Sequence, residues 1–537
     1  MSAFYSIPEL DFPISFATIN HLLADHASRW PDKRALVDLD QGSNLTYADL
    51  ASLVDSTARN VLTLGIGAGD KVVLLADETL EKVVLWLAIW RVGAVICPLN
   101  IEMNERHLVE LCETCAPRAI LMQKSLSTVT SLPELARQAV LYDRWTKEAP
   151  SFLDVENHAV MRDAVLPDEP YGLSDLSTIF CTSGTTEKPK LVVADHFAHW
   201  AGGLSMIDAL GLTPDDRTLE YRSFGWASVQ MLSLMPFLQL GLTLHFASKF
   251  SRSRFFAWIE HNRITFAVGV PTVIAILLEG EAKHNASRMR SLRLMTCSTA
   301  PLSAAQWQAF EDTYELQLIQ MYGMSEANWI CANRPDAFRY GTVGRPVLYQ
   351  KVDIVDPLGA SLGHETEGEI SVSGPHVAVG YLIGNDVIEP IRGTPLKTGD
   401  LGIIDADGFV HITGRSKDLI IRGGMNIAPS EIDSVLSGYA GVREAAAVGV
   451  PDRIYGEEVV CFVVEAPGAT VDAADLTDHC RRYLPPAKVP KNVFFVDELP
   501  RNDRGKVLRS KLRETWTTLS AEETYPTATF RRRLGRP

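Results

Sequence analysis

The segment CTSGTTEKPKLV, at residues 181–192, gathers groups that can bind an anion. Its serine and threonine hydroxyls donate hydrogen bonds, Gly184 lets backbone N–H groups approach an oxygen, and Lys188 and Lys190 add positive charge. A Walker A loop is excluded, because that motif needs a second glycine and a hydroxyl residue directly after its lysine. Taken alone, the segment fits a phosphate-binding loop and a polar turn between two strands equally well.

Three later segments carry residues suited to the same chemistry. MYGMSEA, at residues 321–327, holds Tyr322 and Glu326, and Mg²⁺ prefers carboxylate oxygens combined with substrate phosphates. LKTGDLG holds Asp400, and LPRNDRGKVLRSKL holds Lys506 before a basic amphipathic helix. In isolation these segments also fit a helix N-terminus, a turn aspartate and an exposed surface lysine. Their order along one chain favours the chemical interpretation.

In that order the segments resemble the adenylate-forming superfamily, which includes acyl-CoA and aryl-CoA synthetases, adenylation domains of nonribosomal peptide synthesis and luciferases. In the order strand, T-S-G-T-T-x-x-P-K, helix, the first segment resembles its phosphate loop. Y-G-x-S-E resembles its Y-G-x-T-E segment, and GRSKDLIIRGGMNIAPSEID its passage into a small C-terminal domain. The resemblance covers nearly the whole chain. It implies a ligase in which a carboxylate attacks the α-phosphorus of ATP, pyrophosphate leaves, and a thiol then attacks the acyl-adenylate.

The resemblance assigns a role to each matching residue. Tyr322 stacks on adenine, Asp400 and Arg415 bind the ribose hydroxyls, and Lys506 contacts the carboxylate and the α-phosphate. The expected catalytic residues are Lys506, Glu326 and Lys190, and the expected Mg²⁺ ligands are Glu326 and Thr185. ATP, Mg²⁺ and CoA are the implied cofactors and cosubstrates. The residues expected to bind the nucleotide or CoA are Thr182, Ser183, Gly184, Thr185, Thr186, Lys190, Ser298, Thr299, Ala300, Pro301, Tyr322, Gly323, Ser325, Asp400, Arg415, Lys417, Gly423, Gly424 and Lys506.

The same resemblance implies a moving C-terminal domain. Lys506 lies in the small domain, whereas most of the ATP site lies in the large one, so closure must bring the lysine in. Lys417 is the implied hinge, and residues 422–427 would line the thiol tunnel after rotation. Gly423 and Gly424 suit a place where a pantetheine arm needs close backbone approach.

The acid is expected to bind between the segment YRSFGWASVQ and the residues around Glu326. The expected pocket residues are Phe224, Trp226, Met321, Asn328 and Trp329. Several family members have histidine near the Phe224 position, in a P-L-F-H pattern that this chain lacks. The two indoles favour a short aromatic pocket, and hence an aryl or small carboxylic acid, although they fit a core-filling role equally well.

Other functions stay open. Aromatic walls also suit a quaternary-ammonium acid of the betaine or carnitine type, through attraction of the cation to ring faces. A fatty acid, acyl transfer to a carrier protein, and a catalytically impaired nucleotide-binding homologue are further alternatives. CoA is preferred as acceptor because the chain ends shortly after the lysine segment. The loop also departs from the family, with Glu187 and Leu191 where glycine is usual, and Glu187 is expected to face solvent or a cation.

The elements that must position these residues follow an α/β pattern. A helical segment at residues 44–64 precedes strand-like runs at residues 70–76 and 93–99, and this alternation predicts parallel sheets covered by helices. From about residue 345, closely spaced strands with Asp-Pro and Asp-Gly turns predict an antiparallel β subdomain. We therefore expect a large domain at residues 1–416 and a small α+β lid domain at residues 417–537.

Composition excludes several other classes. The chain has 537 residues, 46% of them hydrophobic, and a net charge of −15, which argues against nucleic-acid binding. No N-terminal signal and no membrane span of about 20 apolar residues is expected. Eight scattered cysteines suit reduced thiols. A cytoplasmic monomer or homodimer, with a carboxylic acid, ATP and CoA as its small-molecule partners, is the expectation.

Overall fold

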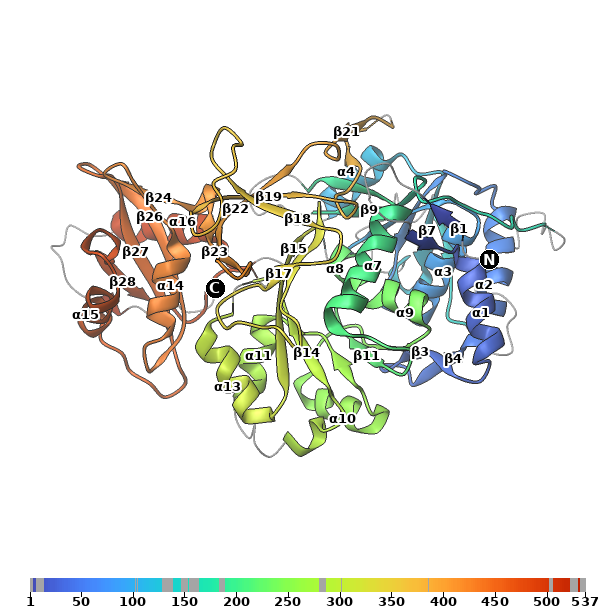
Figure 1. The fold of residues 1–537 in the computed structure, drawn as a ribbon, viewed down its shortest axis with the longest axis horizontal. Coiled ribbons are helices and arrows are strands. Elements are labelled where there is room, and N and C mark those ends of the chain that lie inside the picture. The colour runs from blue at the N-terminus through green and yellow to red at the C-terminus, as the bar shows by residue number, and fades with distance from the viewer. Residues whose placement is uncertain are drawn as a thin grey trace.

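The computed structural model of the chain describes residues 3–5, 14–101, 103, 105–127, 139–145, 153, 164–182, 189–279, 286–300, 302–384, 386–501, 506–521 and 530–531. The predictions for Ser183, Gly184, Thr185, Thr186 and Pro301, and the expectation for Glu187, fall outside these residues. A large body of sheets and helices occupies one end of the molecule, and a smaller C-terminal unit occupies the other (Figure 1).

An eight-stranded sheet runs in the order β21-β20-β10-β9-β6-β5-β7-β8. The strands from β9 to β8 in this order are parallel, whereas β10, β20 and β21 extend the edge as antiparallel neighbours. Its strands are β5 (Lys71–Leu75), β6 (Val95–Leu99), β7 (Ala119–Gln123), β8 (Val140–Tyr142), β9 (Leu176–Cys181), β10 (Leu191–Asp195), β20 (Gly380–Leu382) and β21 (Ile388–Pro390).

A nine-stranded sheet runs in the order β17-β16-β15-β14-β13-β11-β12-β3-β4. The strands from β15 to β3 are parallel, so their carboxyl ends share one edge. The strands are β3 (Arg34–Asp38), β4 (Ser43–Thr46), β11 (Arg217–Glu220), β12 (Thr243–Phe246), β13 (Phe266–Ala267), β14 (Leu294–Cys297), β15 (Gln317–Met324), β16 (Asn328–Ala332) and β17 (Arg345–Pro346).

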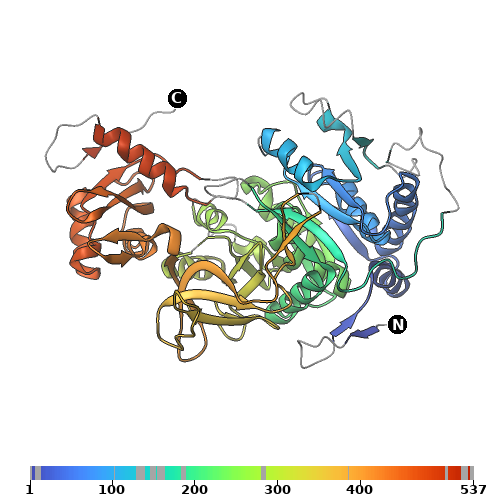
Figure 2. The same cartoon turned by 90° about the horizontal axis from the view of Figure 1, so that it is seen from above.

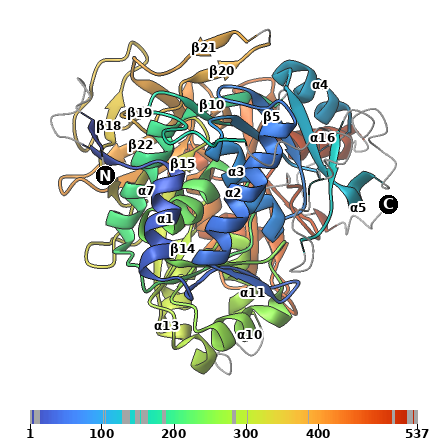
Figure 3. The same ribbon diagram turned by 90° about the vertical axis from the view of Figure 1, so that its right-hand side faces the viewer.

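Helix α3 (Leu80–Arg91) joins the two sheets. All of its residues are buried, because it contacts β6 of one sheet and β3 of the other, with α1 and α2 beside it (Figure 3). The other helices of the large domain are α1 (Ile19–Arg29), α2 (Tyr47–Thr63), α4 (Glu105–Cys115), α5 (Lys124–Ser127), α7 (His196–Leu210), α8 (Ala227–Val229), the π-helical η1 (Gln230–Leu234), α9 (Met235–Leu240), α10 (Arg252–Asn262), α11 (Pro271–Leu278), η2 (Ala286–Met289) and α13 (Ala304–Tyr314).

The antiparallel β subdomain is the four-stranded sheet β18-β19-β22-β23. Its strands are β18 (Lys351–Val355), β19 (Gly368–Ser373), β22 (Leu396–Ile404) and β23 (Val410–Arg415). The hairpin from β22 to β23 pairs Asp400 with Arg415 directly across the two strands. This subdomain confirms the predicted change from parallel to antiparallel structure.

The small C-terminal unit is built on a mixed sheet with β27 (Gly456–Glu465) at its centre. Val459, Cys461 and Val463 face one core cluster and the intervening residues of β27 face another, as the two-residue period of a strand requires. The remaining elements are β24 (Ile420–Arg422), β25 (Met425–Ile427), α14 (Pro429–Ser437), β26 (Val442–Asp452), α15 (Ala473–Tyr483), η4 (Pro486–Lys488), β28 (Asn492–Phe495), α16 (Arg509–Ala521) and β29 (Phe530–Arg531).

The connection between the two units is short. From β23 the chain passes through η3 (Ser416–Asp418) straight into β24, and the small unit lies beyond it at the end of the molecule (Figure 2). The Ser416 hydroxyl donates to the Gly399 carbonyl at 3.0 Å, which fixes the start of this connection on the β subdomain. The boundary at Lys417 falls on η3 and stays a prediction.

Two expectations need correction. The segment at residues 44–64 is not helical throughout, because residues 44–46 belong to β4 and Thr46 then caps α2, accepting the backbone N–H of Asp49. A helix was expected directly after the phosphate loop, but β10 intervenes and α7 begins only at His196. The residues of β10 are all buried, which suits a strand covered on both faces.

Two remaining features concern cysteines and membranes. All eight cysteines are buried and none of them belongs to a disulfide, and Cys112 and Cys115 lie on α4. Within the part of the chain that the structure describes, none of the helices is long and apolar enough to cross a bilayer.

Candidate active site

The base of the candidate phosphate loop is fixed by Thr182 and Lys190. The Thr182 N–H donates to the Lys190 carbonyl at 2.9 Å, and the Lys190 N–H donates to the Thr182 hydroxyl at 3.1 Å. These bonds continue the pairing of β9 with β10 as far as the two residues that flank the loop. Leu191 is a buried residue at the start of β10, opposite Cys181. Its side chain therefore packs in the core of the sheet and is not part of the loop.

A second hairpin, β15–β16, carries Tyr322, Gly323, Ser325 and Glu326. Gly323 has no room for a side chain, because a Cβ there would lie 2.2 Å from the carbonyl oxygen of Asn328. A register shift between Tyr322 and Gly323 turns the strand at this point. The close approach fixes Glu326 in the tight turn that follows.

Tyr322, Asp400 and Arg415 form a connected polar cluster. The Tyr322 hydroxyl donates to Asp400 Oδ2 at 2.6 Å, and Arg415 Nε lies 2.6 Å from Asp400 Oδ1. Burial, and after it the Asp400 carboxylate, raise the pKa of Tyr322 far above its usual range, so the phenol remains a donor. The structure thus joins three residues that lie far apart in the sequence and were assigned to adenine and ribose.

Lys506 lies beside this cluster, although it belongs to the C-terminal unit. An isolated antiparallel β-bridge between Arg501 and Val507 fixes the backbone next to Lys506. Burial, and after it the positive charge of Arg415, lower the pKa of Lys506 to about 8, against the opposing effect of the Asp400 and Asp418 carboxylates. The structure therefore places the candidate catalytic lysine at the ribose end of the candidate ATP site.

The segment from Ser298 to Ala300 follows the carboxyl end of β14. Ser298 is buried, and its hydroxyl has no hydrogen-bond partner among the described residues. Thr299 adopts φ +82°, a conformation that costs energy for a β-branched residue and is found mostly at functional sites. Ala300 accepts a long hydrogen bond from the side chain of Gln320 on β15. This geometry suits a ligand contact at the edge shared by the parallel strands.

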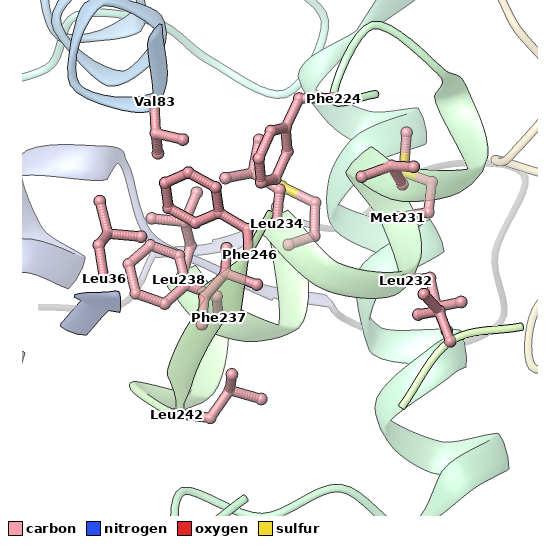
Figure 4. Close-up of a cluster of buried hydrophobic side chains, with 14 of the residues drawn as sticks. Leu36, Val83, Phe224, Met231, Leu232, Leu234, Phe237, Leu238, Leu242 and Phe246 are labelled. Atoms are coloured by element: carbon pink, nitrogen blue, oxygen red, sulfur yellow. The ribbon is translucent and has the colours of Figure 1, made fainter. Parts of the chain in front are cut away.

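The expected acid-pocket residues come from two neighbouring elements. Trp226 lies in the loop between β11 and α8, and α8 packs against β16, which carries Asn328 and Trp329. Met321 and Trp329 are buried, and the Trp329 indole N–H has no partner within the described residues. Phe224 is buried like these two residues, with its ring 5.7 Å from that of Phe246 in the hydrophobic core (Figure 4), and its place in an acid pocket stays a prediction.

Buried polar side chains hold the loop of Phe224 from both sides. Glu78 accepts hydrogen bonds from the Ser223 hydroxyl at 2.6 Å and the Phe224 N–H at 3.2 Å, and Gln230 donates to the Phe224 carbonyl at 3.0 Å. Gln230 in turn contacts His199 Nε2 at 2.8 Å. The sequence reasoning missed both residues: Glu78 is far from this loop in the chain, and Gln230, although only six residues from Phe224, belongs to no motif that marks its role.

Tyr381 is another residue that the sequence reasoning missed. Its hydroxyl donates to Glu326 Oε1 at 2.9 Å, and the Lys190 ammonium lies 4.9 Å from the centre of its ring. Tyr381 therefore stands between the candidate metal ligand and the candidate phosphate-binding lysine.

The hairpin from β24 to β25 carries Gly423 and Gly424 at its tip. Both adopt positive φ, +58° and +82°, as a two-residue turn between twisted strands requires. Both residues are exposed, and so is Lys417. In this conformation Lys506 faces the large domain, and the glycine hairpin does not form part of the cluster around Asp400.

The residues present fit a magnesium ion. Glu326 is half-buried and binds Tyr381 through one carboxylate oxygen, which leaves Oε2 for a metal. Mg²⁺ is usually held by one or two carboxylates together with substrate phosphates, so a single carboxylate oxygen is a suitable protein ligand for it.

Comparison with known proteins agrees with this geometry. The family model described as AMP-binding enzyme matches residues 23–382, and that of its C-terminal domain matches residues 431–506. The sulfoacetate–CoA ligase of Cupriavidus necator is 32% identical, over 93% of this chain and 98% of its own, and the oxalate–CoA ligase of Arabidopsis thaliana is 31% identical, over 92% and 97%. The structure of ATP-bound MatB from Rhodopseudomonas palustris matches with a TM-score of 0.83 and 29% identity, over 94% of this chain and 100% of that one.

The fold and these matches define an adenylate-forming enzyme. The chain belongs to the AMP-binding enzyme family, and within that family it is an AMP-forming acyl-CoA synthetase. The resemblance that the motifs suggested, and the α/β architecture with its C-terminal domain, are confirmed.

Gly323→Ala tests the close approach in the β15–β16 hairpin. We expect a lower melting temperature and a kcat/KM for ATP reduced about a hundredfold, the order expected when reacting groups are displaced by about 1 Å. Gly67→Ala is the matched control, because a Cβ there meets nothing within 4 Å. Thermal denaturation and ATP-dependent pyrophosphate exchange measure both effects, and wild-type kinetics in Gly323→Ala would contradict the expectation.

Proposed function

We propose that the protein is an ATP-dependent carboxylic acid:CoA ligase that activates an aryl or small carboxylic acid. The observation that carries this proposal is the position of Lys506 beside the Tyr322–Asp400–Arg415 cluster. A cation at this place meets the α-phosphate when the ribose is bound at Asp400. The arrangement is therefore the one that the adenylate-forming half-reaction needs.

The first half-reaction brings two anions together. Preorganised cations stabilise its transition state more than the separated reactants, because charge gathers on the α-phosphate as the carboxylate attacks. In this proposal Lys190 and the hydroxyls of the loop hold the outer phosphates, Glu326 holds Mg²⁺, and Lys506 contacts the carboxylate and the α-phosphate. Mg²⁺ supplies charge neutralisation at the phosphates. No nucleophilic side chain is needed.

The second half-reaction requires a different arrangement. The Gly423–Gly424 hairpin is exposed here and would line a thiol tunnel only after the C-terminal unit has rotated about Lys417. Rotation would also withdraw Lys506. CoA is the proposed acceptor. The relatives include CoA ligases for sulfoacetate, oxalate and 2-succinylbenzoate, and these support both the acceptor and a small acid.

The acid itself is proposed from the pocket residues. Trp226, Met321 and Trp329 lie on neighbouring elements and pack in one hydrophobic cluster with Phe224, so two indoles and a phenyl ring are the aromatic walls of the proposed pocket. Bulky walls favour a short acid over a long chain. A quaternary-ammonium acid is the second candidate, because ring faces attract cations.

A panel of acids tests the proposed substrate class. The panel includes benzoates, phenylpropenoates, short and long fatty acids, trimethylammonium acids and small dicarboxylates, each assayed by pyrophosphate release and by thioester formation with CoA. We expect turnover with aryl or small acids and none with long chains. Exclusive activity on long chains would reject the pocket argument, and nucleotide binding without turnover of any acid would indicate an impaired homologue.

Lys506→Ala tests the division of labour between the two half-reactions. We expect adenylation to fall by about 10² to 10³-fold, as for loss of one transition-state donor, while thioester formation from synthetic acyl-adenylate changes by less than about threefold. Lys511→Ala, an exposed lysine on α16, is the control. Equal losses in both half-reactions would contradict the proposed role.

The pH dependence of adenylation gives an independent test. The cationic form of Lys506 is the active one, and its pKa of about 8 means that the cation is lost as pH rises through 8 rather than near 10.5. We expect kcat/KM for adenylation to be constant below about pH 7 and about tenfold lower at pH 9, since kcat/KM reports the free enzyme. In Lys506→Arg this decline should disappear, because guanidinium stays charged. A decline unchanged in that variant would assign it to another group.

A further inference from the structure

Tyr381 connects two parts of the ATP site that come from different strands. It lies on β20, opposite Val192 of β10. Lys190 precedes Val192 by two residues and so points to the same side, where a long side chain and an aromatic ring can meet diagonally. The ammonium lies 4.9 Å from the ring centre, within the range of a cation–π interaction.

The hydroxyl of Tyr381 contacts a second residue of the candidate site, Glu326. It donates to Glu326 Oε1 at 2.9 Å. Two further hydrogen bonds fasten the same hairpin to the segment before β20: the Ala378 N–H donates to the Glu326 carbonyl at 2.8 Å, and the Asn328 side-chain amide donates to the His376 carbonyl at 2.9 Å. The turn of Glu326 is thus held against the segment at residues 376–381.

We propose that Tyr381 is a positioning residue that holds the magnesium-binding carboxylate and the phosphate-binding lysine at a fixed separation. This inference rests on the roles of Glu326 and Lys190 in the proposed function. The Tyr381 hydroxyl donates to one carboxylate oxygen of Glu326, which leaves Oε2 available to a metal. The ring contacts the Lys190 ammonium without pairing its charge with an anion. A carboxylate partner in place of the ring would lower the charge available to the phosphates.

The chemistry explains why one tyrosine serves both partners. Glu326 and Lys190 attract each other, and a direct ion pair between them would remove both from the substrate. The phenol separates them, since its edge hydroxyl binds the anion and its face binds the cation. Burial, and then the Glu326 charge, raise the pKa of Tyr381 above its usual range, so the hydroxyl remains a donor.

Two variants separate the functions of the ring and the hydroxyl. Tyr381→Phe removes the bond to Glu326 and keeps the ring, whereas Tyr381→Leu removes both. The probe is ATP binding without acid or CoA, measured by calorimetry once in EDTA and once at saturating Mg²⁺. This readout does not depend on which acid the enzyme activates.

In EDTA, we expect Tyr381→Phe to bind ATP with the dissociation constant of the wild type, within about twofold. The factor by which Mg²⁺ strengthens ATP binding should be about tenfold smaller in this variant. This is the lower end of the usual loss when the partner of a metal ligand is removed. Tyr381→Leu should also bind ATP several-fold more weakly in EDTA. In the background of Glu326→Gln, Tyr381→Phe should add little, because its effect passes through the carboxylate.

Tyr314→Phe is the matched control for loss of a buried phenol, since its hydroxyl donates to the Leu277 carbonyl. Equal weakening of ATP binding with and without Mg²⁺ in Tyr381→Phe, or full additivity with Glu326→Gln, would overturn the positioning role. A wild type that turns over no acid but shows the expected metal-dependent pattern would contradict the proposed ligase function and leave this inference standing.

Discussion

The carboxylate of Asp400 is the point at which the parts of this site meet. One oxygen accepts the Tyr322 hydroxyl and the other pairs with Arg415, so a single buried anion joins the β15–β16 hairpin to the β subdomain. Its charge also opposes the cost of burying Lys506. Without a fixed anion there, Arg415 and the lysine of the C-terminal unit would repel each other across the interface. The conformation competent for adenylation therefore depends on Asp400 for its electrostatic balance.

The topology explains why hairpins carry the site. The parallel strands of each large sheet end at one shared edge, and along one side both sheets continue with antiparallel strands: β10 and β20 in one, β16 and β17 in the other. Where the last parallel strand meets its antiparallel neighbour the chain reverses direction, from β9 to β10 and from β15 to β16. Lys190 and Glu326 lie next to these reversals, and β20 connects them through Tyr381.

The sequence predicted the features that local motifs encode. The α/β class, the antiparallel subdomain and the family followed from strand patterns and from segments such as T-G-D and Y-G-x-S-E. β10 was missed because a short apolar run between a loop and a helix has no periodicity of its own. Tyr381 and Glu78 were missed for a different reason, since the residues they contact lie tens to hundreds of positions away in the sequence. Gln230 lies only six residues from Phe224, but no motif marks its side chain as a partner of the Phe224 carbonyl. The packing of the Phe224 ring against Phe246 is likewise a feature of the tertiary structure that no local motif encodes.

The cations of the site differ in the groups that offset their charge. Three cations, Lys190, Arg415 and Lys506, and two carboxylates, Glu326 and Asp400, lie where a polyanionic nucleotide and its metal are proposed to bind. Arg415 is paired with Asp400, the Lys190 ammonium lies over a ring face, and the Asp400 and Asp418 carboxylates oppose the cost of burying Lys506. A ring balances a cation more weakly than a carboxylate does, so Lys190 keeps the most charge for a phosphate. Such graded balancing holds each group in place before substrate arrives and reduces the reorganisation required during reaction, which is the physical basis of electrostatic catalysis.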